Sequence, residues 1–182
     1  MNTPNKLTLF RIILVPLFMV VALYEITPFP TVVALIVFIL ACLTDWLDGY
    51  LARKNNEVTN FGKIVDPLAD KMLVTAALLC LVHDNLVSPW IAIIILAREF
   101  IVSGIRISAA AEGNVIAASI WGKAKTVWQF IAICIALVLA DFAAEVVLAK
   151  AIIDICMWGA AVLTVISGVD YVVKNIKYLS MK

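Results

Sequence analysis

The sequence has few charged residues for its length. Charged residues make up 15% and hydrophobic residues 64% of its 182 positions, whereas soluble domains are about 45–50% apolar. A soluble protein of this length would have too few polar side chains to cover its surface. The net charge of +1 gives no indication of a nucleic-acid partner. The composition therefore predicts a membrane protein.

Residues that build disulfides and soft-metal sites are also scarce. The four cysteines lie singly in apolar runs without Cys-x-x-Cys spacing, and the one histidine, His83, lies in a short connection. Isolated cysteines of this kind usually act as small core residues, so we expect neither disulfides nor cysteine metal ligands. No Gly/Ser linker or internal repeat divides the chain, and a single domain over residues 1–182 is expected.

Six apolar stretches are long enough to cross the hydrocarbon core of a bilayer, which takes about 20 helical residues. They are Leu7–Tyr24, Thr31–Leu51, Phe61–Leu81, Ser88–Ser108, Ile120–Ala140 and Ala149–Val172. The first is longer than the apolar region of a secretory signal, and no small-x-small cleavage site follows it. The sequence therefore predicts an all-α, polytopic membrane protein with six transmembrane helices.

Lysine and arginine are concentrated on alternate connections. They lie near both termini, between the second and third spans, and between the fourth and fifth, whereas Glu25–Pro30 and Val82–Val87 contain none. Cytoplasmic loops carry the Lys/Arg excess in membrane proteins. Both termini and these two connections are therefore predicted to be cytoplasmic.

Four aspartates lie inside the second and third spans, where an ionisable residue is costly and usually functional. Asp45 and Asp48 are three residues apart, and Asp66 and Asp70 are four apart, so each pair shares one helix face. The second span runs toward the cytoplasm and the third runs back, so both pairs are expected at similar depth near the cytoplasmic surface. Pairing with nearby bases would account for only one or two of them.

Converging carboxylates repel each other unless cations or protons intervene. Hard divalent cations take oxygen ligands, and Mg²⁺ usually binds through a few carboxylates and substrate phosphates. Two such ions about 3.5–4 Å apart could clamp the attacking and leaving oxygens of a phosphoryl transfer. The sequence thus predicts a site for Mg²⁺ or Mn²⁺ at these aspartates.

The segment that contains the aspartates resembles a known signature. Asp45-Trp-Leu-Asp48-Gly49-Tyr-Leu-Ala52-Arg53, followed at fixed spacing by Gly62, Asp66 and Asp70, has eight specified residues in 26 positions. All eight match the signature of the CDP-alcohol phosphatidyltransferase family, and the six-helix layout agrees along the whole chain. The resemblance implies an enzyme that joins a CDP-activated lipid to an alcohol.

The resemblance implies roles for the matching positions. The four aspartates would hold two divalent ions, and Asp70 would also act as the base. Gly49, Ala52, Arg53 and Gly62 would line the CDP-lipid site. The family also implies a homodimer in a bacterial cell membrane, with its active site at the cytoplasmic side and its lipid substrate entering from the bilayer.

Segments outside the signature resemble the family branch whose acceptor is sn-glycerol 3-phosphate, with CDP-diacylglycerol as donor. These segments contain three substrate-site candidates near the N-terminus, Asn5, Thr8 and Arg11. They also contain five residues for the acceptor phosphate, Arg98, Glu99, Arg106, Lys123 and Lys125. Arginine suits bidentate contact with a phosphate, and lysine adds a point charge.

Three alternatives remain open from the sequence. Another enzyme of the same family, making cardiolipin or phosphatidylinositol phosphate, would share the aspartates but differ in the acceptor site. A divalent-cation transporter would place carboxylates near the bilayer midplane, often at broken helices, whereas here they cluster at one end. A non-catalytic membrane scaffold would not require the eight-residue signature.

Overall fold

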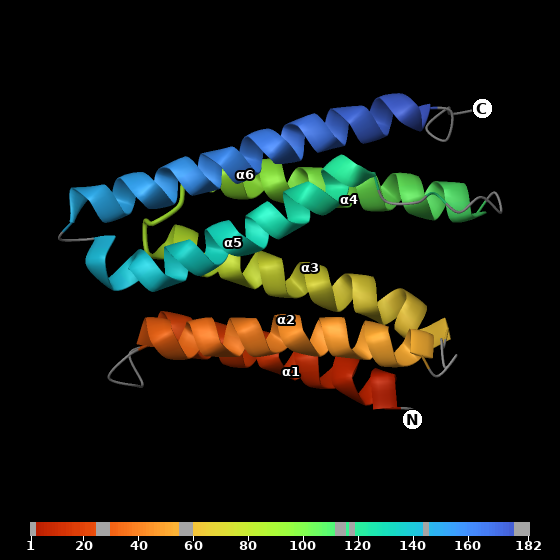
Figure 1. The fold of residues 1–182 in the computed structure, drawn as a ribbon, viewed down its shortest axis with the longest axis horizontal. Helices are drawn as coiled ribbons and strands as arrows, with labels where there is room; N and C mark the ends of the chain where they lie inside the picture. Colours follow the sequence, from red (N-terminus) through yellow and green to blue (C-terminus); the bar gives the residue numbers. More distant parts are fainter. Residues whose placement is uncertain are drawn as a thin grey trace. The chain divides into compact units, whose positions relative to one another are not determined.

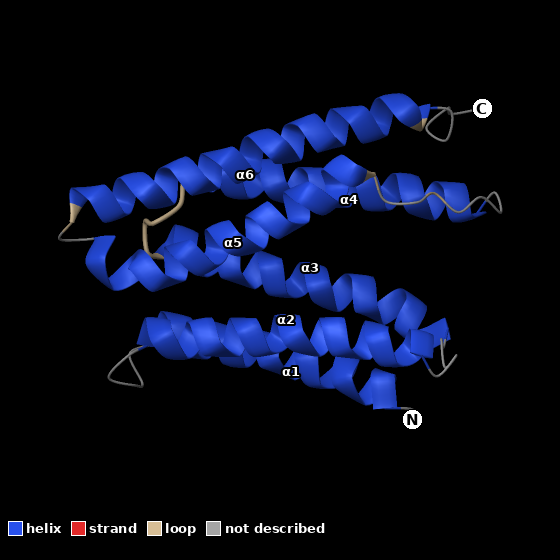
Figure 2. Cartoon of the chain, viewed as in Figure 1, coloured by secondary structure: helices blue, strands red, loops and turns tan. Residues whose placement is uncertain are grey.

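The computed structural model describes residues 3–24, 30–54, 60–111, 116, 119–143 and 146–176. Within these ranges, the side chains of residues 3–6, 46, 48–54, 60–64, 66, 67, 111 and 143 are outside the description. The regular elements in the described ranges are all helices (Figure 2). They are α1 (Thr3–Leu23), α2 (Pro30–Lys54), α3 (Asn60–His83), α4 (Pro89–Ala111), α5 (Ile120–Ala143) and α6 (Val147–Lys174) (Figure 1). The predicted all-α class with six helices is confirmed.

Each helix is long for a globular protein. The shortest, α1, has 21 residues and the longest, α6, has 28, so each extends at least about 30 Å at 1.5 Å per residue. Over the described residues, Ile120–Phe142 and Val147–Lys174 are long and apolar enough to cross a membrane. Leu7–Leu23 and Pro30–Asp45 form shorter apolar helical stretches.

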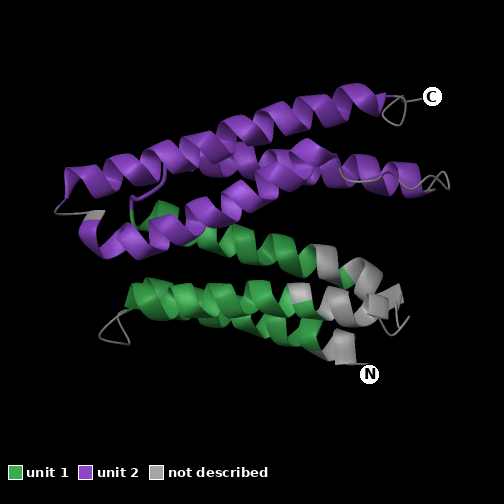
Figure 3. Ribbon diagram, viewed as in Figure 1, with its two compact units in different colours: residues 1–84 green, residues 85–182 purple. Residues whose placement is uncertain are grey.

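The helices form two compact units, Met1–Asp84 with α1 to α3 and Asn85–Lys182 with α4 to α6 (Figure 3). The expectation of one domain stays a prediction. In the first unit, α1 packs against both α2 and α3, and α2 also contacts α3. Phe18 of α1 and Phe38 of α2 are fully buried, with ring centroids 5.9 Å apart. This contact holds α1 beside α2.

In the second unit, α6 packs against both α4 and α5. Its buried face consists largely of small residues, including Ala160, Ala161, Thr164 and Ser167, which allow neighbouring helix backbones to approach closely. Near the start of α6, Lys150 Nζ donates hydrogen bonds to the carbonyl oxygens of Asn85 and Leu86, at 2.8 and 2.9 Å. Asn85 has a positive φ of 57°, a conformation that asparagine tolerates. The lysine thus secures the turn that precedes α4.

Large apolar side chains are exposed along the helices of both units. Ile13 on α1 is 64% exposed and Ile155 on α6 is 71% exposed. Many large apolar side chains are exposed in this way along the helices, and extensive exposed apolar surface marks a membrane or protein contact. The outward faces therefore suit a lipid environment.

Candidate active site

The signature aspartates lie on two helices of the first unit that contact each other. Asp45 and Asp48 lie in the last three turns of α2, and Asp66 and Asp70 lie in the first three turns of α3. The helices α2 and α3 follow one another along the chain and pack together. The C-terminal part of α2 and the N-terminal part of α3 thus carry one pair of aspartates each.

Two of these carboxylates have described side chains. The Asp45 side chain is 46% exposed, and Asp70 is half-buried. The side chains of Asp48 and Asp66 lie outside the described residues, as do those of the predicted CDP-site residues Ala52 and Arg53. Gly49 and Gly62, which belong to the same predicted site, lie in the same undescribed parts of α2 and α3.

Arg11 is the close partner of the first aspartate. Its Nη1 lies 2.6 Å from Asp45 Oδ1, and the arginine side chain is fully buried. Thr8, one turn earlier on α1, is also buried, so both residues lie on the inner face of the helix. A buried cation of this kind requires a paired anion. The side chain of Asn5, the third N-terminal candidate, is outside the described residues.

Sequence reasoning placed Arg11 near the substrate but missed its ion pair with Asp45. Arg11 lies about two turns after the start of α1, and Asp45 lies between two and three turns before the end of α2. Consecutive spans run in opposite directions, so the two residues are at similar depth. A lone arginine in an apolar span at the depth of an aspartate was the signal that could have revealed the pair.

The second unit contains a buried cluster of three charged residues. The Lys125 ammonium group on α5 pairs with Glu99 Oε1 on α4, and Arg98 Nη1 donates to the same oxygen at 3.3 Å. The exposed fractions of the Lys125, Arg98 and Glu99 side chains are 2%, 12% and 20%. The three formal charges sum to +1, so the cluster favours an anion. The structure thus brings together three of the five predicted acceptor-site residues.

The other two predicted acceptor residues have different surroundings. Arg106 is exposed, its Nε donates to the Tyr171 hydroxyl on α6 at 3.3 Å, and its guanidinium carbon lies 5.7 Å from the centroid of that ring. Such a contact between a cation and an aromatic ring is favourable. Lys123 is exposed in the first turn of α5. The structure does not therefore gather all five residues around one carboxylate.

Gln129 extends the buried polar surface on α5. It lies four residues after Lys125, on the same helix face, and is 2% exposed. Its Oε1 has no hydrogen-bond partner among the described groups, although buried polar atoms are nearly always satisfied. The inner face of α5 thus presents an ammonium group and an amide.

Comparison with known proteins identifies the class. The family model for CDP-alcohol phosphatidyltransferase matches residues 1–166, and the chain belongs to this family. Membrane-embedded transferases of phospholipid biosynthesis make up the family, in agreement with the long apolar helices.

Relatives from several bacteria carry one specific name, CDP-diacylglycerol--glycerol-3-phosphate 3-phosphatidyltransferase. The protein of that name from Bacillus subtilis (strain 168) is 46% identical, over 96% of this chain and 95% of its own length. The Rickettsia bellii (strain RML369-C) protein is 39% identical, over 93% of each chain. The Escherichia coli (strain K12) protein is 44% identical, over 72% of this chain and 74% of its own.

Proposed function

We propose that this chain transfers the phosphatidyl group of CDP-diacylglycerol to sn-glycerol 3-phosphate, giving phosphatidylglycerophosphate and CMP. The observation that carries the proposal is the similarity, over nearly the whole chain, to bacterial proteins named for this reaction. The paired aspartates of α2 and α3 supply the carboxylates that such a phosphoryl transfer needs.

A single assay tests the proposal and the choice of acceptor. Purified protein is incubated with labelled CDP-diacylglycerol and a panel of alcohols, and CMP release is measured. We expect release with sn-glycerol 3-phosphate and little with phosphatidylglycerol or inositol phosphate. Preference for either of these would instead indicate the cardiolipin or phosphatidylinositol phosphate reaction.

The four aspartates would supply the donor set for two divalent ions, Mg²⁺ or Mn²⁺. The carboxylates of Asp45 and Asp70 are each partly exposed and therefore accessible, and carboxylate oxygens are the ligands these ions prefer. Asp48 and Asp66 complete the set that would hold the ions. When bound, the ions would offset the negative charge of the diphosphate and of the departing CMP.

Asp70 is the proposed base. Of the two signature aspartates on α3, Asp66 and Asp70, it lies farther from the start of that helix. Its carboxylate would accept the proton of the acceptor hydroxyl as the hydroxyl oxygen bonds to the β-phosphorus and the bond from that phosphorus to the CMP oxygen breaks. A base must lie within hydrogen-bond reach of the proton that it accepts. This role therefore requires Asp70 to lie beside the hydroxyl group of the bound acceptor.

The CDP-lipid site is proposed at Gly49, Ala52, Arg53 and Gly62. Small residues beside the aspartates would let the nucleotide approach the helix backbones, and Arg53, four residues after Gly49, lies on the same face of α2. Thr8 and Arg11 on the inner face of α1, with Asn5 near its start, would border the same substrate region.

The acceptor phosphate is proposed to bind at the Arg98–Glu99–Lys125 cluster, with Arg106 and Lys123 adding positive charge. A largely buried cluster with a net charge of +1 is suited to binding a dianionic acceptor. Hydrogen bonds from arginine and lysine to phosphate are among the strong ones in proteins. Glu99 would hold both cations in place until the acceptor arrives.

Six spans, with both termini and the active site on the cytoplasmic side, are the proposed arrangement in the membrane. The length of every helix, at least about 30 Å, and the placement of Lys and Arg at alternate connections support it. We further propose that the enzyme works as a homodimer, and its mass by light scattering in detergent tests this.

A further inference from the structure

The side chain of Arg98 runs between glycines of two other helices. A Cβ atom added at Gly168, on α6, would lie 2.9 Å from Arg98 Cγ, closer than carbon atoms pack. A Cβ atom added at Gly122, on α5, would lie 3.4 Å from Arg98 Nη2, an ordinary van der Waals contact, and 3.2 Å from Ser119 Oγ, a tighter contact. Gly168 therefore controls the space for the stem of Arg98, and Gly122 faces its guanidinium group.

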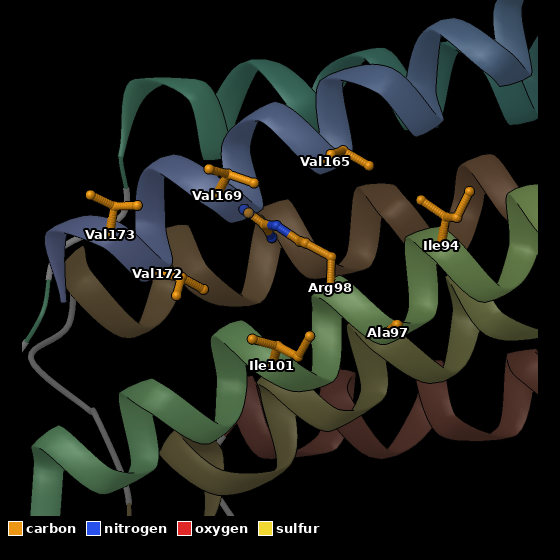
Figure 4. Close-up of a pocket in the computed structure, with 9 residues that line it drawn as sticks. Ile94, Ala97, Arg98, Ile101, Val165, Val169, Val172 and Val173 are labelled. Carbon is orange, nitrogen blue, oxygen red and sulfur yellow. The ribbon is translucent and has the colours of Figure 1, made fainter. Parts of the chain in front are cut away.

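Much of the Arg98 side chain lies among apolar residues of α4 and α6. Arg98 lines a pocket of about 330 Å³ between α4 and α6, where it extends toward α6 among aliphatic side chains such as Ile101, Val165 and Val169 (Figure 4). Its Nε atom is buried and has no hydrogen-bond partner among the described groups. Packing of the stem, together with the bond from Nη1 to Glu99, therefore sets the position of the guanidinium group.

Glycine is a poorer helix former than alanine, so a glycine inside a helix invites a steric explanation. Gly104 on α4 has none, because nothing lies within 4 Å of an added Cβ atom there. Gly168 differs, because the side chain of Arg98 already occupies the space of its missing Cβ atom. The two glycines can therefore be compared directly: a methyl group added at Gly168 would displace Arg98, whereas one added at Gly104 would displace nothing.

We propose that Gly168 is a positioning residue for acceptor binding. Its missing Cβ atom lets the stem of Arg98 pass directly over α6, which places the guanidinium group beside Glu99. Gly168 itself does not touch the substrate. This inference rests on the proposed acceptor role of Arg98, and it assigns control of acceptor affinity to a helix that contains none of the signature aspartates.

The test compares Gly168→Ala with Gly104→Ala in steady-state kinetics with both substrates. The new methyl group should displace Arg98 and raise the KM for sn-glycerol 3-phosphate on the order of tenfold, the effect of losing one charge-assisted hydrogen bond. The KM for CDP-diacylglycerol should stay nearly unchanged. Gly104→Ala should leave both KM values as they are, and Gly122→Ala should give a smaller acceptor effect than Gly168→Ala.

A double-mutant cycle with Arg98→Ala separates positioning from general helix packing. Arg98→Ala removes the Cγ atom that the new methyl group would meet, so Gly168→Ala should then have no further effect on acceptor KM or on thermal stability. Contacting residues are coupled in such cycles, whereas independent ones add. If Gly168→Ala alone fails to fold while the double variant folds, the same clash is demonstrated.

Distinct results overturn the inference and the proposed acceptor site. Equal effects of Gly168→Ala with and without Arg98, or an equal rise in both KM values, would make Gly168 a helix-packing residue only. If Arg98→Ala left the acceptor KM unchanged, the acceptor role of Arg98 would fail, and with it the functional part of the inference. Coupling in thermal stability would still decide whether Gly168 positions Arg98.

Discussion

Arg11 Nη1 on α1 lies 2.6 Å from Asp45 Oδ1 on α2. The pair joins a fully buried guanidinium group to the first aspartate of the signature. It therefore links the N-terminal helix of the chain directly to the carboxylates proposed to bind metal. The arginine fixes the orientation of one carboxylate and offsets part of the negative charge in the first unit.

Arg11→Met should lower both stability and activity. It removes the ion pair with Asp45, and because the Asp45 side chain is 46% exposed, we expect the free energy of unfolding to fall by about 1–3 kcal/mol. Arg11→Lys, which keeps the charge, should lose less. Thermal unfolding in detergent and CMP release measure the two effects. Equal stability of the wild type and Arg11→Met would show that the ion pair contributes nothing.

The four signature aspartates should each be needed for activity. Changing Asp45, Asp48, Asp66 or Asp70 to Asn keeps the shape but removes the charge that would bind a divalent ion. We expect losses of roughly 10²-fold or more in kcat/KM, because electrostatic stabilisation is a large term in phosphoryl transfer. Asp84→Asn is the control, since Asp84 is exposed and pairs with His83. Full activity in excess EDTA would contradict the metal requirement.

Substitutions of the two lysines of α5 should affect acceptor binding differently, because one lysine is buried and the other is exposed. Lys125 is 2% exposed and bound to Glu99, whereas Lys123 is exposed. If the buried cluster binds the acceptor phosphate, Lys125→Ala should raise the KM for sn-glycerol 3-phosphate roughly 10- to 100-fold, and Lys123→Ala should raise it much less. Acceptor-dependent CMP release measures both. The reverse order would move the phosphate site toward the surface of the helix.

The bounds of the helices could be predicted from the sequence because the bilayer sets them. The stretch Thr31–Leu51 became α2, Pro30–Lys54, and Ile120–Ala140 became α5, Ile120–Ala143. The helices continue past the apolar stretches because backbone hydrogen bonding does not end where the hydrophobic residues end. Each predicted pair of aspartates lies within one helix, Asp45 and Asp48 in α2 and Asp66 and Asp70 in α3.

The contacts between helices could not be predicted in the same way. The similar depth of Arg11 and Asp45 can be inferred from the sequence, but the fit of Arg98 against Gly168 cannot, because it depends on how each helix is rotated about its axis. Apolar residues cover nearly every face of these helices, so hydrophobic periodicity does not identify the inner one. The pairing of Glu99 with both Arg98 and Lys125 depends on the same rotation.

Gly49 offers a steric test of the CDP-lipid site. Gly49→Leu should obstruct the nucleotide and raise the KM for CDP-diacylglycerol at least about tenfold, an expected loss of 1.4 kcal/mol or more in binding. The KM for the acceptor should change little. Gly104→Leu is a suitable control, because nothing lies within 4 Å of an added Cβ atom there. An unchanged KM for CDP-diacylglycerol in Gly49→Leu would remove this residue from the site.

The orientation in the membrane can be tested independently of the enzymatic activity. Because Lys and Arg accumulate on cytoplasmic loops, Lys54→Cys and Lys174→Cys should be protected from an impermeant thiol reagent in intact cells. Asp141→Cys, in the last turn of α5, and Glu145→Cys, after the end of that helix, should react from outside. The four native cysteines are first replaced, and permeabilised cells, in which all four sites should react, serve as the control. Labelling of position 54 in intact cells would reverse the orientation and place the aspartates on the outer side, away from CDP-activated lipids and phosphorylated acceptors made in the cytoplasm.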